Sequence, residues 1–266
     1  MKYLVSLILS VGIHDLSADV VQAHYSMLLP QGVSARRGQP VTILFQWGHP
    51  FEHQLANAAP PSRLTALPPS GKRADFTKTL EEVAVSGPDG KKVRAFQFQF
   101  TPEERGDFVF ALHGSPIWME EDHEFFLDTV QVVLHVQAQK GWDASFGKGM
   151  EMTPLTRPYG LQPGMVFQAR VLADGQGLAG TMVEVERYNA SPPANLPPDE
   201  HITRTAKTDP AGVVTVSLME PGWWGLTAAR NGGKKEHDGK SFPIRERVTL
   251  WVFVDDPKTI QNTPVK

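Results

Sequence analysis

Histidine is the residue type whose placement in this sequence best suits chemistry. The chain of 266 residues has nine histidines and no cysteine, so thiolate metal sites, disulfides and cysteine nucleophiles are excluded. The segment His49–His53 places two imidazoles and the carboxylate of Glu52 within five positions. Imidazole and carboxylate donors suit first-row transition metals. Because Pro50 disfavours a helix here, we expect a loop at a strand end, where ligands from several elements can converge.

The first residues predict a second group of nitrogen donors. Lys2 precedes the apolar run Tyr3–Ile13, and Val21 and Ala23 then occupy the −3 and −1 positions of a signal-peptidase site. The run is about 11 residues, against the roughly 20 that a membrane-spanning helix needs. We therefore expect a cleaved signal peptide, the alternative being an uncleaved N-terminal strand or helix. Cleavage would give His24 a free α-amine beside its imidazole, and this pair can chelate nickel, cobalt, copper or zinc.

An acidic and aromatic stretch at residues 118–126 offers one further ligand. His123 lies inside it, and Trp118 could form a wall of the site, whereas its carboxylates are better explained as a charged loop before a strand. His113 follows a predicted strand and fits an ordinary core histidine as well as a ligand. The predicted metal ligands are therefore His24, His49, His53 and His123.

Composition and motifs exclude other classes of function. With a formal net charge of −3 and no basic block, the chain lacks the electrostatic footprint of a nucleic-acid-binding protein. The sequence has no nucleophile elbow, no glycine-rich phosphate loop and no helical zinc-protease signature. Trp223 and Trp224 are more typical of core packing than of a sugar platform. We therefore predict a binding protein and not an enzyme.

Short apolar runs between turn residues predict that β-strands position these histidines. The 22 prolines and 23 glycines are scattered between such runs, and no segment has helical periodicity over three turns. Val41–Phe45 leads toward His49, and Ala95–Phe100 places phenylalanines on one face at a period of two. Ala56–Gly71, rich in proline and alanine, is predicted as a surface loop. Further strands are predicted at residues 83–85, 107–112, 129–136, 166–172, 181–188, 203–208, 213–218, 223–229 and 248–254.

The pattern predicts an all-β protein made of two antiparallel β-sandwich domains, immunoglobulin-like or prealbumin-like. The predicted divisions are a signal peptide at residues 1–23, a metal-binding sandwich at 24–145, a linker at 146–160, a second sandwich at 161–256 and a tail at 257–266. With its turns at Asp174-Gly175 and Asp209–Gly212, the second sandwich resembles the prealbumin-like modules of bacterial surface and periplasmic proteins.

Several stretches together resemble a family of exported bacterial proteins linked to nickel and cobalt uptake, long catalogued under a domain of unknown function. These stretches include Ala23–Pro30, His49–Glu52, Gly106–Phe110, Pro154–Leu161 and Pro221–Gly225. The resemblance implies a periplasmic protein that binds Ni²⁺ or Co²⁺ and cooperates with a membrane transporter, with ligands from the processed His24 and from His49. Family members often have glycine at position 53, and the resemblance leaves the third and fourth ligands open.

Two alternatives stay open from the sequence. A copper-binding protein or copper monooxygenase with a terminal histidine would use the same processed His24 and a second histidine on a β-sandwich. Nitrogen donors bind Cu²⁺ with higher affinity than Ni²⁺, and they bind Zn²⁺ as well. A structural or adhesive β-sandwich protein would carry its histidines incidentally. Stoichiometric metal binding separates this last alternative from the others, and copper redox cycling separates a copper enzyme from a carrier.

Overall fold

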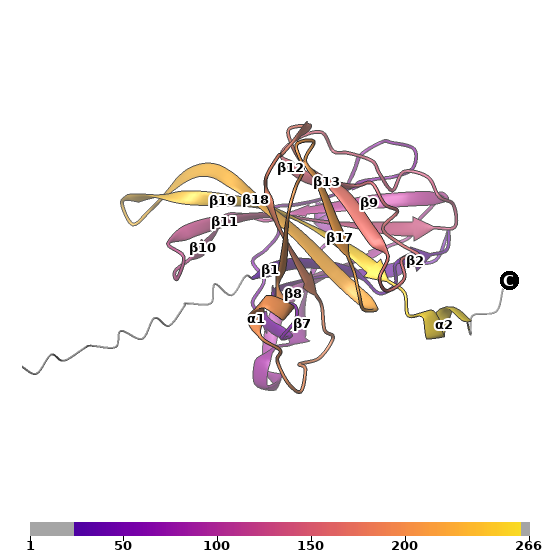
Figure 1. Cartoon of the computed structure of the whole chain (residues 1–266), viewed down its shortest axis with the longest axis horizontal. Helices are drawn as coiled ribbons and strands as arrows, with labels where there is room; N and C mark the ends of the chain where they lie inside the picture. Colours follow the sequence, from indigo (N-terminus) through magenta and orange to yellow (C-terminus); the bar gives the residue numbers. More distant parts are fainter. Residues whose placement is uncertain (1–23, 262–266) are drawn as a thin grey trace, which may run out of the picture.

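Residues 24–261 are described by the computed structural model, and most of them lie in β-strands (Figure 1). The predicted all-β class is confirmed. The predicted signal peptide at residues 1–23 lies outside the described residues, as do residues 262–266. The helical segments are η1 (Thr77–Thr79), η2 (Pro88–Gly90), α1 (Asp199–Ile202) and α2 (Pro257–Gln261). None of the helices within the described range is long and apolar enough to cross a membrane.

Three sheets make up the molecule. The first has the order β1 (Tyr25–Pro30), β3 (Val41–His49), β8 (Lys92–Phe100) and β7 (Glu81–Ser86), with β4 (Gln54–Ala56) beside β3. The second runs β16 (Arg204–Lys207), β15 (Met182–Arg187), β18 (Gly222–His237), β19 (Lys240–Val254), β11 (Glu124–Val136), β9 (Gly106–His113), β5 (Arg63–Leu67) and β6 (Ala74–Asp75), with β10 (Ile117–Met119) and β2 (Ser34–Ala35) beside β11. The third contains β12 (Met150–Pro154), β13 (Val166–Ala173) and β14 (Gln176–Gly177), with β17 (Val213–Ser217) beside β13.

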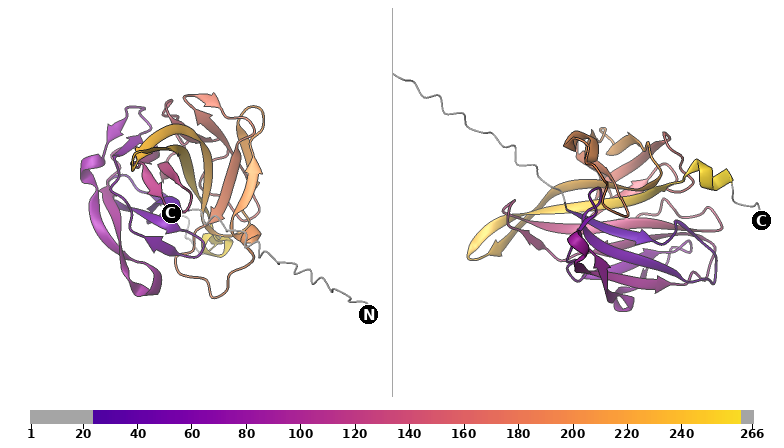
Figure 2. Two further views of the ribbon diagram at one scale, coloured as in Figure 1. Left: turned by 90° about the vertical axis from the view of Figure 1, so that its left-hand side faces the viewer. Right: turned by 90° about the horizontal axis from the view of Figure 1, so that it is seen from below.

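The second sheet is shared by two hydrophobic cores. One core lies between the first sheet and strands β5, β9 and β11, where Phe98, Phe110 and Leu134 are buried. The other lies between the third sheet and strands β15, β18 and β19, where Phe167 and Leu226 are buried. In Figure 2 the long hairpin of β18 and β19 passes between the N-terminal strands and the third sheet. A single sheet therefore takes part in both sandwiches.

Three features differ from the sequence prediction. Strand β11 pairs in parallel with β19 and with β2, where the pattern predicts only antiparallel sheets. The predicted surface loop Ala56–Gly71 contains β5, which buries Leu64 and Ala66 and pairs with β9; the prolines on both sides obscure this short strand. The predicted linker at residues 146–160 contains β12, whose Met150 and Met152 belong to the second core.

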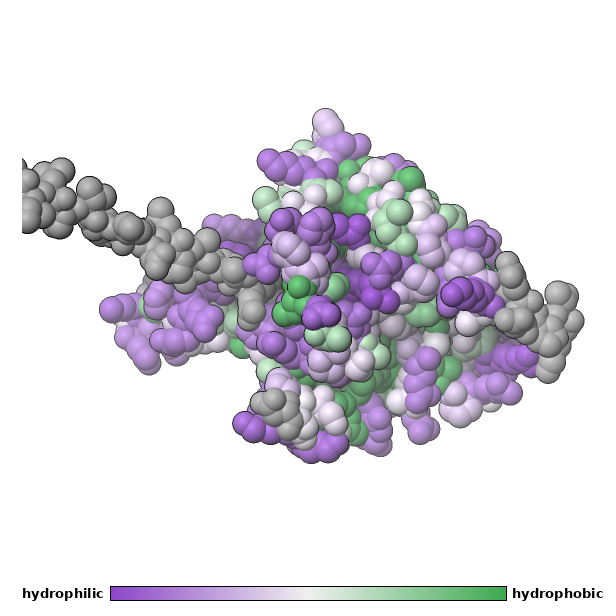
Figure 3. Space-filling model, turned by 60° about the horizontal axis from the view of Figure 1, so that its bottom comes forward, coloured by the Kyte–Doolittle hydropathy of each residue, from purple (hydrophilic) through white to green (hydrophobic). Residues whose placement is uncertain are grey.

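The outer surface of the molecule is more polar than its two cores. The face shown in Figure 3 is mainly hydrophilic, with apolar groups between the polar ones. Exposed large apolar side chains do occur, among them Val166 and Met219 at 52% and 57% exposure. Scattered residues of this kind are normal on folded proteins. Most large apolar side chains are therefore buried in the cores, where they hold the sheets together.

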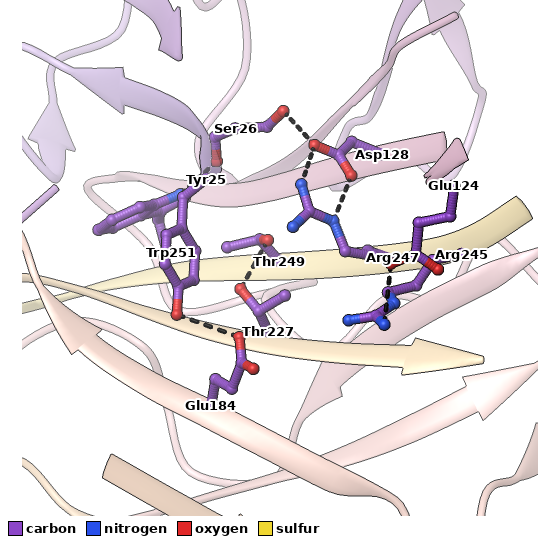
Figure 4. A network of polar contacts seen from close by, with 10 residues as sticks. All are labelled: Tyr25, Ser26, Glu124, Asp128, Glu184, Thr227, Arg245, Arg247, Thr249 and Trp251. Atoms are coloured by element: carbon purple, nitrogen blue, oxygen red, sulfur yellow. Dashed lines mark hydrogen bonds and ion pairs between the residues drawn. The ribbon is translucent and has the colours of Figure 1, made fainter. Parts of the chain in front are cut away.

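A buried ion pair fastens β19 to β11 (Figure 4). Arg247 of β19 donates from Nε and Nη2 to the two carboxylate oxygens of Asp128 in β11, at 2.7 and 2.8 Å. The two side chains are 6% and 8% exposed, and the guanidinium lies 3.8 Å from the ring centre of Phe126. Ser26 of β1 donates its hydroxyl to Asp128 at 2.8 Å and accepts at its backbone oxygen from Trp251 Nε1 at 2.9 Å. Strand β1 is thus held at the place where β11 and β19 meet.

Replacing Arg247 with methionine is expected to lower the free energy of unfolding by about 3–5 kcal/mol, because the Asp128 carboxylate would stay buried without its cation. Chemical denaturation of the two proteins measures the difference. Arg230→Met is the control: it removes an ion pair with Glu246 whose side chains are 30% and 17% exposed, and it should change the same free energy by less than about 1 kcal/mol. Equal losses in the two variants would contradict a special role for the buried pair.

Candidate metal centre

His24 and His49 meet at one end of the first sheet. Strands β1 and β3 are antiparallel with Tyr25 opposite Gly48, and the same register carried one residue further places His24 opposite His49. The centres of the two rings are 4.2 Å apart and their planes are tilted by 48°. The His24 ring also stacks on Trp47, at 4.3 Å and 12°. Strand pairing alone therefore brings the two imidazoles together.

Both rings have nitrogens without a partner in the described part of the chain. Nδ1 of His24 is buried and has no hydrogen bond. His49 is 7% exposed, and its ring takes part in no hydrogen bond with another described residue. Buried polar atoms in folded proteins are nearly always paired. The buried Nδ1 of His24, in a ring that touches the His49 ring, is therefore a nitrogen donor that no described residue engages.

Burial keeps both imidazoles uncharged at neutral pH. Desolvation, followed by the neighbouring His49, lowers the pKa of His24 to about 4. Desolvation also lowers the pKa of His49, against the opposing charges of Glu52 and Glu121. Neutral imidazole is the form that binds a metal ion, so no proton has to leave either ring when an ion arrives.

The turn that follows His49 is fastened to a distant part of the chain. Phe51 donates its backbone N–H to Glu186 Oε1 at 3.2 Å. Asn189 donates twice, from Nδ2 to the Phe51 oxygen at 2.6 Å and from its backbone N–H to the Pro50 oxygen at 3.0 Å. The position of the turn thus depends on β15 and on the loop that follows it.

The other two predicted ligands, His53 and His123, are not part of the imidazole contact. His53 Nδ1 lies 2.8 Å from the Asn189 backbone oxygen and its ring packs 5.9 Å from Tyr188, so this side chain links the turn to the loop after β15. His123 is exposed in the turn between β10 and β11, with its ring centre 6.3 Å from that of Trp118. Across residues 24–261, no three or more His, Cys, Asp or Glu side chains are gathered for a metal ion.

Trp47, which stacks on His24, and Glu52, which lies in the turn after His49, are absent from the predicted ligand set. Trp47 is two positions before His49, so the alternation of β3 places both rings on one face, and this signal was present in the sequence. Glu52 Oε2 is buried and has no hydrogen-bond partner among the residues described. Its burial comes from the geometry of the turn, which residue types alone do not reveal.

A family model for a domain of unknown function, DUF4198, matches residues 21–232 of the chain. The chain belongs to this family. The DUF4198 match begins before β1 and ends within β18, so it includes both histidines of the contact and the turn that follows His49. Comparison with curated proteins gives no significant match for this DUF4198 protein.

Three solved structures show weak similarity to the DUF4198 protein. A DUF4785 family protein from Legionella pneumophila is 9% identical over 79% of this chain and 53% of its own, with a TM-score of 0.30. Escherichia coli alpha-2-macroglobulin activated by porcine elastase is 15% identical over 88% and 20%, with a TM-score of 0.25. A two-domain fibronectin type III segment from chicken tenascin is 9% identical over 87% and 100%, with a TM-score of 0.22. The chain spans about half of the first structure and a fifth of the second.

The low pKa of His24 makes stability depend on pH. An unfolded imidazole titrates near 6.5 and the folded one near 4, so between these values the unfolded state binds the extra proton. The free energy of unfolding should therefore fall as the pH is lowered from about 6.5 to about 4. NMR titration of the His24 ring protons, assigned with a His24→Gln variant, should give a midpoint near pH 4. A midpoint near the ordinary value would mean that the ring is hydrated and the contact with His49 is absent.

Proposed function

We propose that this protein is an exported, periplasmic carrier of a transition-metal ion, Ni²⁺ or Co²⁺, which it binds with His24 and His49 and presents to a membrane transporter. The observation that supports this most directly is the contact between two largely buried imidazoles, 4.2 Å apart, with an unpaired Nδ1 on His24. Imidazole donors favour first-row transition metals over Mg²⁺ and Ca²⁺, which prefer oxygen.

Processing after Ala23 would complete the set of nitrogen donors. The α-amine and Nδ1 of His24 are separated by three carbon atoms, so one ion bound to both closes a six-membered chelate ring. His49 adds a third nitrogen from β3. Because Ser26 is hydrogen-bonded to the buried Asp128, the new N-terminus would be held beside the His49 ring.

An incomplete set of protein donors suits an ion carried as cargo. Three nitrogens leave further coordination positions open, through which an ion can pass to the next binding site. Ni²⁺ and Co²⁺ are proposed because of the family resemblance, since ligand type alone ranks Cu²⁺ higher. The same resemblance supports the periplasm as the compartment and a membrane transporter as the partner.

The geometry also supports a second candidate, a copper protein with a terminal-histidine site. An α-amine, Nδ1 of the same histidine and a second imidazole are donors that bind Cu²⁺ more tightly than Ni²⁺. Aerobic oxidation of ascorbate by the copper-loaded protein separates the two candidates. Sustained oxidation with the copper retained would favour a copper enzyme, and reversible Ni²⁺ or Co²⁺ binding without oxidation by the copper form would favour the carrier.

His24→Ala and His49→Ala, each in the processed protein that begins at residue 24, should weaken Ni²⁺ and Co²⁺ binding by at least about 10–100-fold, the loss seen when even a supporting group of a metal site is removed. Calorimetric titration measures Kd and stoichiometry, and mass spectrometry establishes the N-terminal residue. His201→Ala is the matched control because His201 is exposed in α1. This control should bind like the wild type.

A processed protein with one extra residue before His24 tests the chelate directly. Its α-amine is displaced from Nδ1, so it should bind Ni²⁺ more weakly than the protein that begins at His24. Unchanged affinity would remove the α-amine from the site. A wild-type protein that binds no transition-metal ion at micromolar concentration would refute the carrier and favour a structural or adhesive role.

A further inference from the structure

We infer that the protein binds a small zwitterion, an α-amino acid with an apolar side chain, in a pocket beside the buried pair of Arg247 and Asp128. The pocket has a volume of about 180 Å³ and lies on the second sheet. Four neighbouring strands supply its walls: Phe126 of β11, Met182 and Glu184 of β15, Ala229 of β18, and Arg245 and Arg247 of β19. His24 and His49 do not line this pocket, so it is a site separate from the proposed metal centre.

Strand alternation places the pocket on the sheet face that is turned away from the second core. Val183 and Ala228 face that core, so their sequence neighbours Glu184 and Ala229 face the other way. Arg247 is the cross-strand partner of Ala229 and lies on the same face. The pocket is therefore a polar site on the sheet that the two sandwiches share.

Two guanidiniums on one side of the pocket retain free hydrogen-bond donors. Arg247 uses Nε and Nη2 for Asp128, and none of the described residues accepts a hydrogen bond from its Nη1. Arg245 Nη2 lies 2.8 Å from Glu124 Oε1, and its other nitrogens have no partner within residues 24–261. Both guanidiniums lie near the ring centre of Phe126, at 3.8 Å for Arg247 and 5.7 Å for Arg245. Donors of this kind match a carboxylate.

Glu184 supplies a negative charge to the same pocket (Figure 4). Its Oε2 accepts the Tyr25 hydroxyl at 3.2 Å, and its Oε1 has no hydrogen bond with another described residue. No ion pair joins Glu184 to Arg245 or Arg247 in the described part of the chain. Opposite charges therefore line one pocket without contacting each other, and a molecule that carries both charges would contact both sides.

An α-amino acid carries its two charges close together, because one carbon atom joins the ammonium and carboxylate groups. The apolar part of the wall, from Phe126, Met182 and Ala229, suits an aliphatic side chain. Methionine adapts to ligands of varied shape. A simple carboxylic acid would cover Glu184 without giving it a partner, and this costs free energy. Leucine therefore suits the pocket better than its analogue without the amine.

Calorimetric titration of the protein that begins at residue 24, without added metal, tests the inference with three compounds. They are L-leucine, 4-methylpentanoate, which lacks the amine, and 3-methylbutylamine, which lacks the carboxylate. Leucine should bind with a Kd at least about 10-fold lower than either analogue, because each analogue loses one charge-assisted hydrogen bond.

Three variants assign the roles of the side chains, and Arg247 is left intact because it holds β19 to β11. Glu184→Gln keeps an oxygen for the Tyr25 hydroxyl but loses the charge, so it should weaken leucine binding by about 10-fold and leave 4-methylpentanoate binding unchanged. Arg245→Gln should weaken the binding of both compounds by about 10-fold. Glu82→Gln is the matched control, exposed on β7, and should bind like the wild type.

Equal affinity of the wild type for leucine and 4-methylpentanoate would overturn the inference, and so would no binding of leucine at millimolar concentration. An equal loss of both compounds in Glu184→Gln would also contradict it, because the carboxylate would then only support the fold. Circular dichroism checks folding. If Glu184→Gln does not fold, Glu184→Asp shortens the reach of the carboxylate and must weaken the binding of leucine more than that of 4-methylpentanoate.

Discussion

A guanidinium and a carboxylate buried side by side, those of Arg247 and Asp128, hold β19 against β11 where the two hydrophobic cores adjoin. Neither charge can leave its partner without a large loss of free energy, so the parallel pairing of these strands is tied to the pair. Ser26 shares the same carboxylate. This bond connects β1, and with it His24, to the junction of the two sandwiches, so the candidate metal centre is positioned from the middle of the molecule.

Strand β15 supports the same centre from the other side. Glu184 accepts the Tyr25 hydroxyl at 3.2 Å, and Glu186 accepts the Phe51 N–H, so two acids of one strand hold the residue after His24 and the turn that follows His49. The first sheet presents the imidazoles, and the C-terminal strands keep them in place. Because both rings are held before any ligand arrives, little ordering of side chains would oppose binding.

The sequence predicts the strands well because alternation is a local property. Ala95–Phe100 is an example, and it lies within β8 with alternate phenylalanines buried. The prediction is wrong at β5, where a short apolar run stands among prolines. The contact of His24 with His49 follows from strand register. The partner of His53, by contrast, is a backbone oxygen 136 positions further along the chain. Hydrogen bonds between such distant residues depend on how the sheets pack against each other. Local sequence patterns carry no information about that packing.

The stacking of Trp47 on His24, with ring centres 4.3 Å apart, has an optical consequence. Indole fluorescence is quenched by a nearby ion whose d shell is partly filled, because the excited ring transfers its energy to that ion. An open-shell ion bound to His24 would therefore quench the fluorescence of Trp47, and a closed-shell ion such as Zn²⁺ would not. The chain has six tryptophans, and this one would act as a built-in indicator of whether the centre is filled and by which kind of ion.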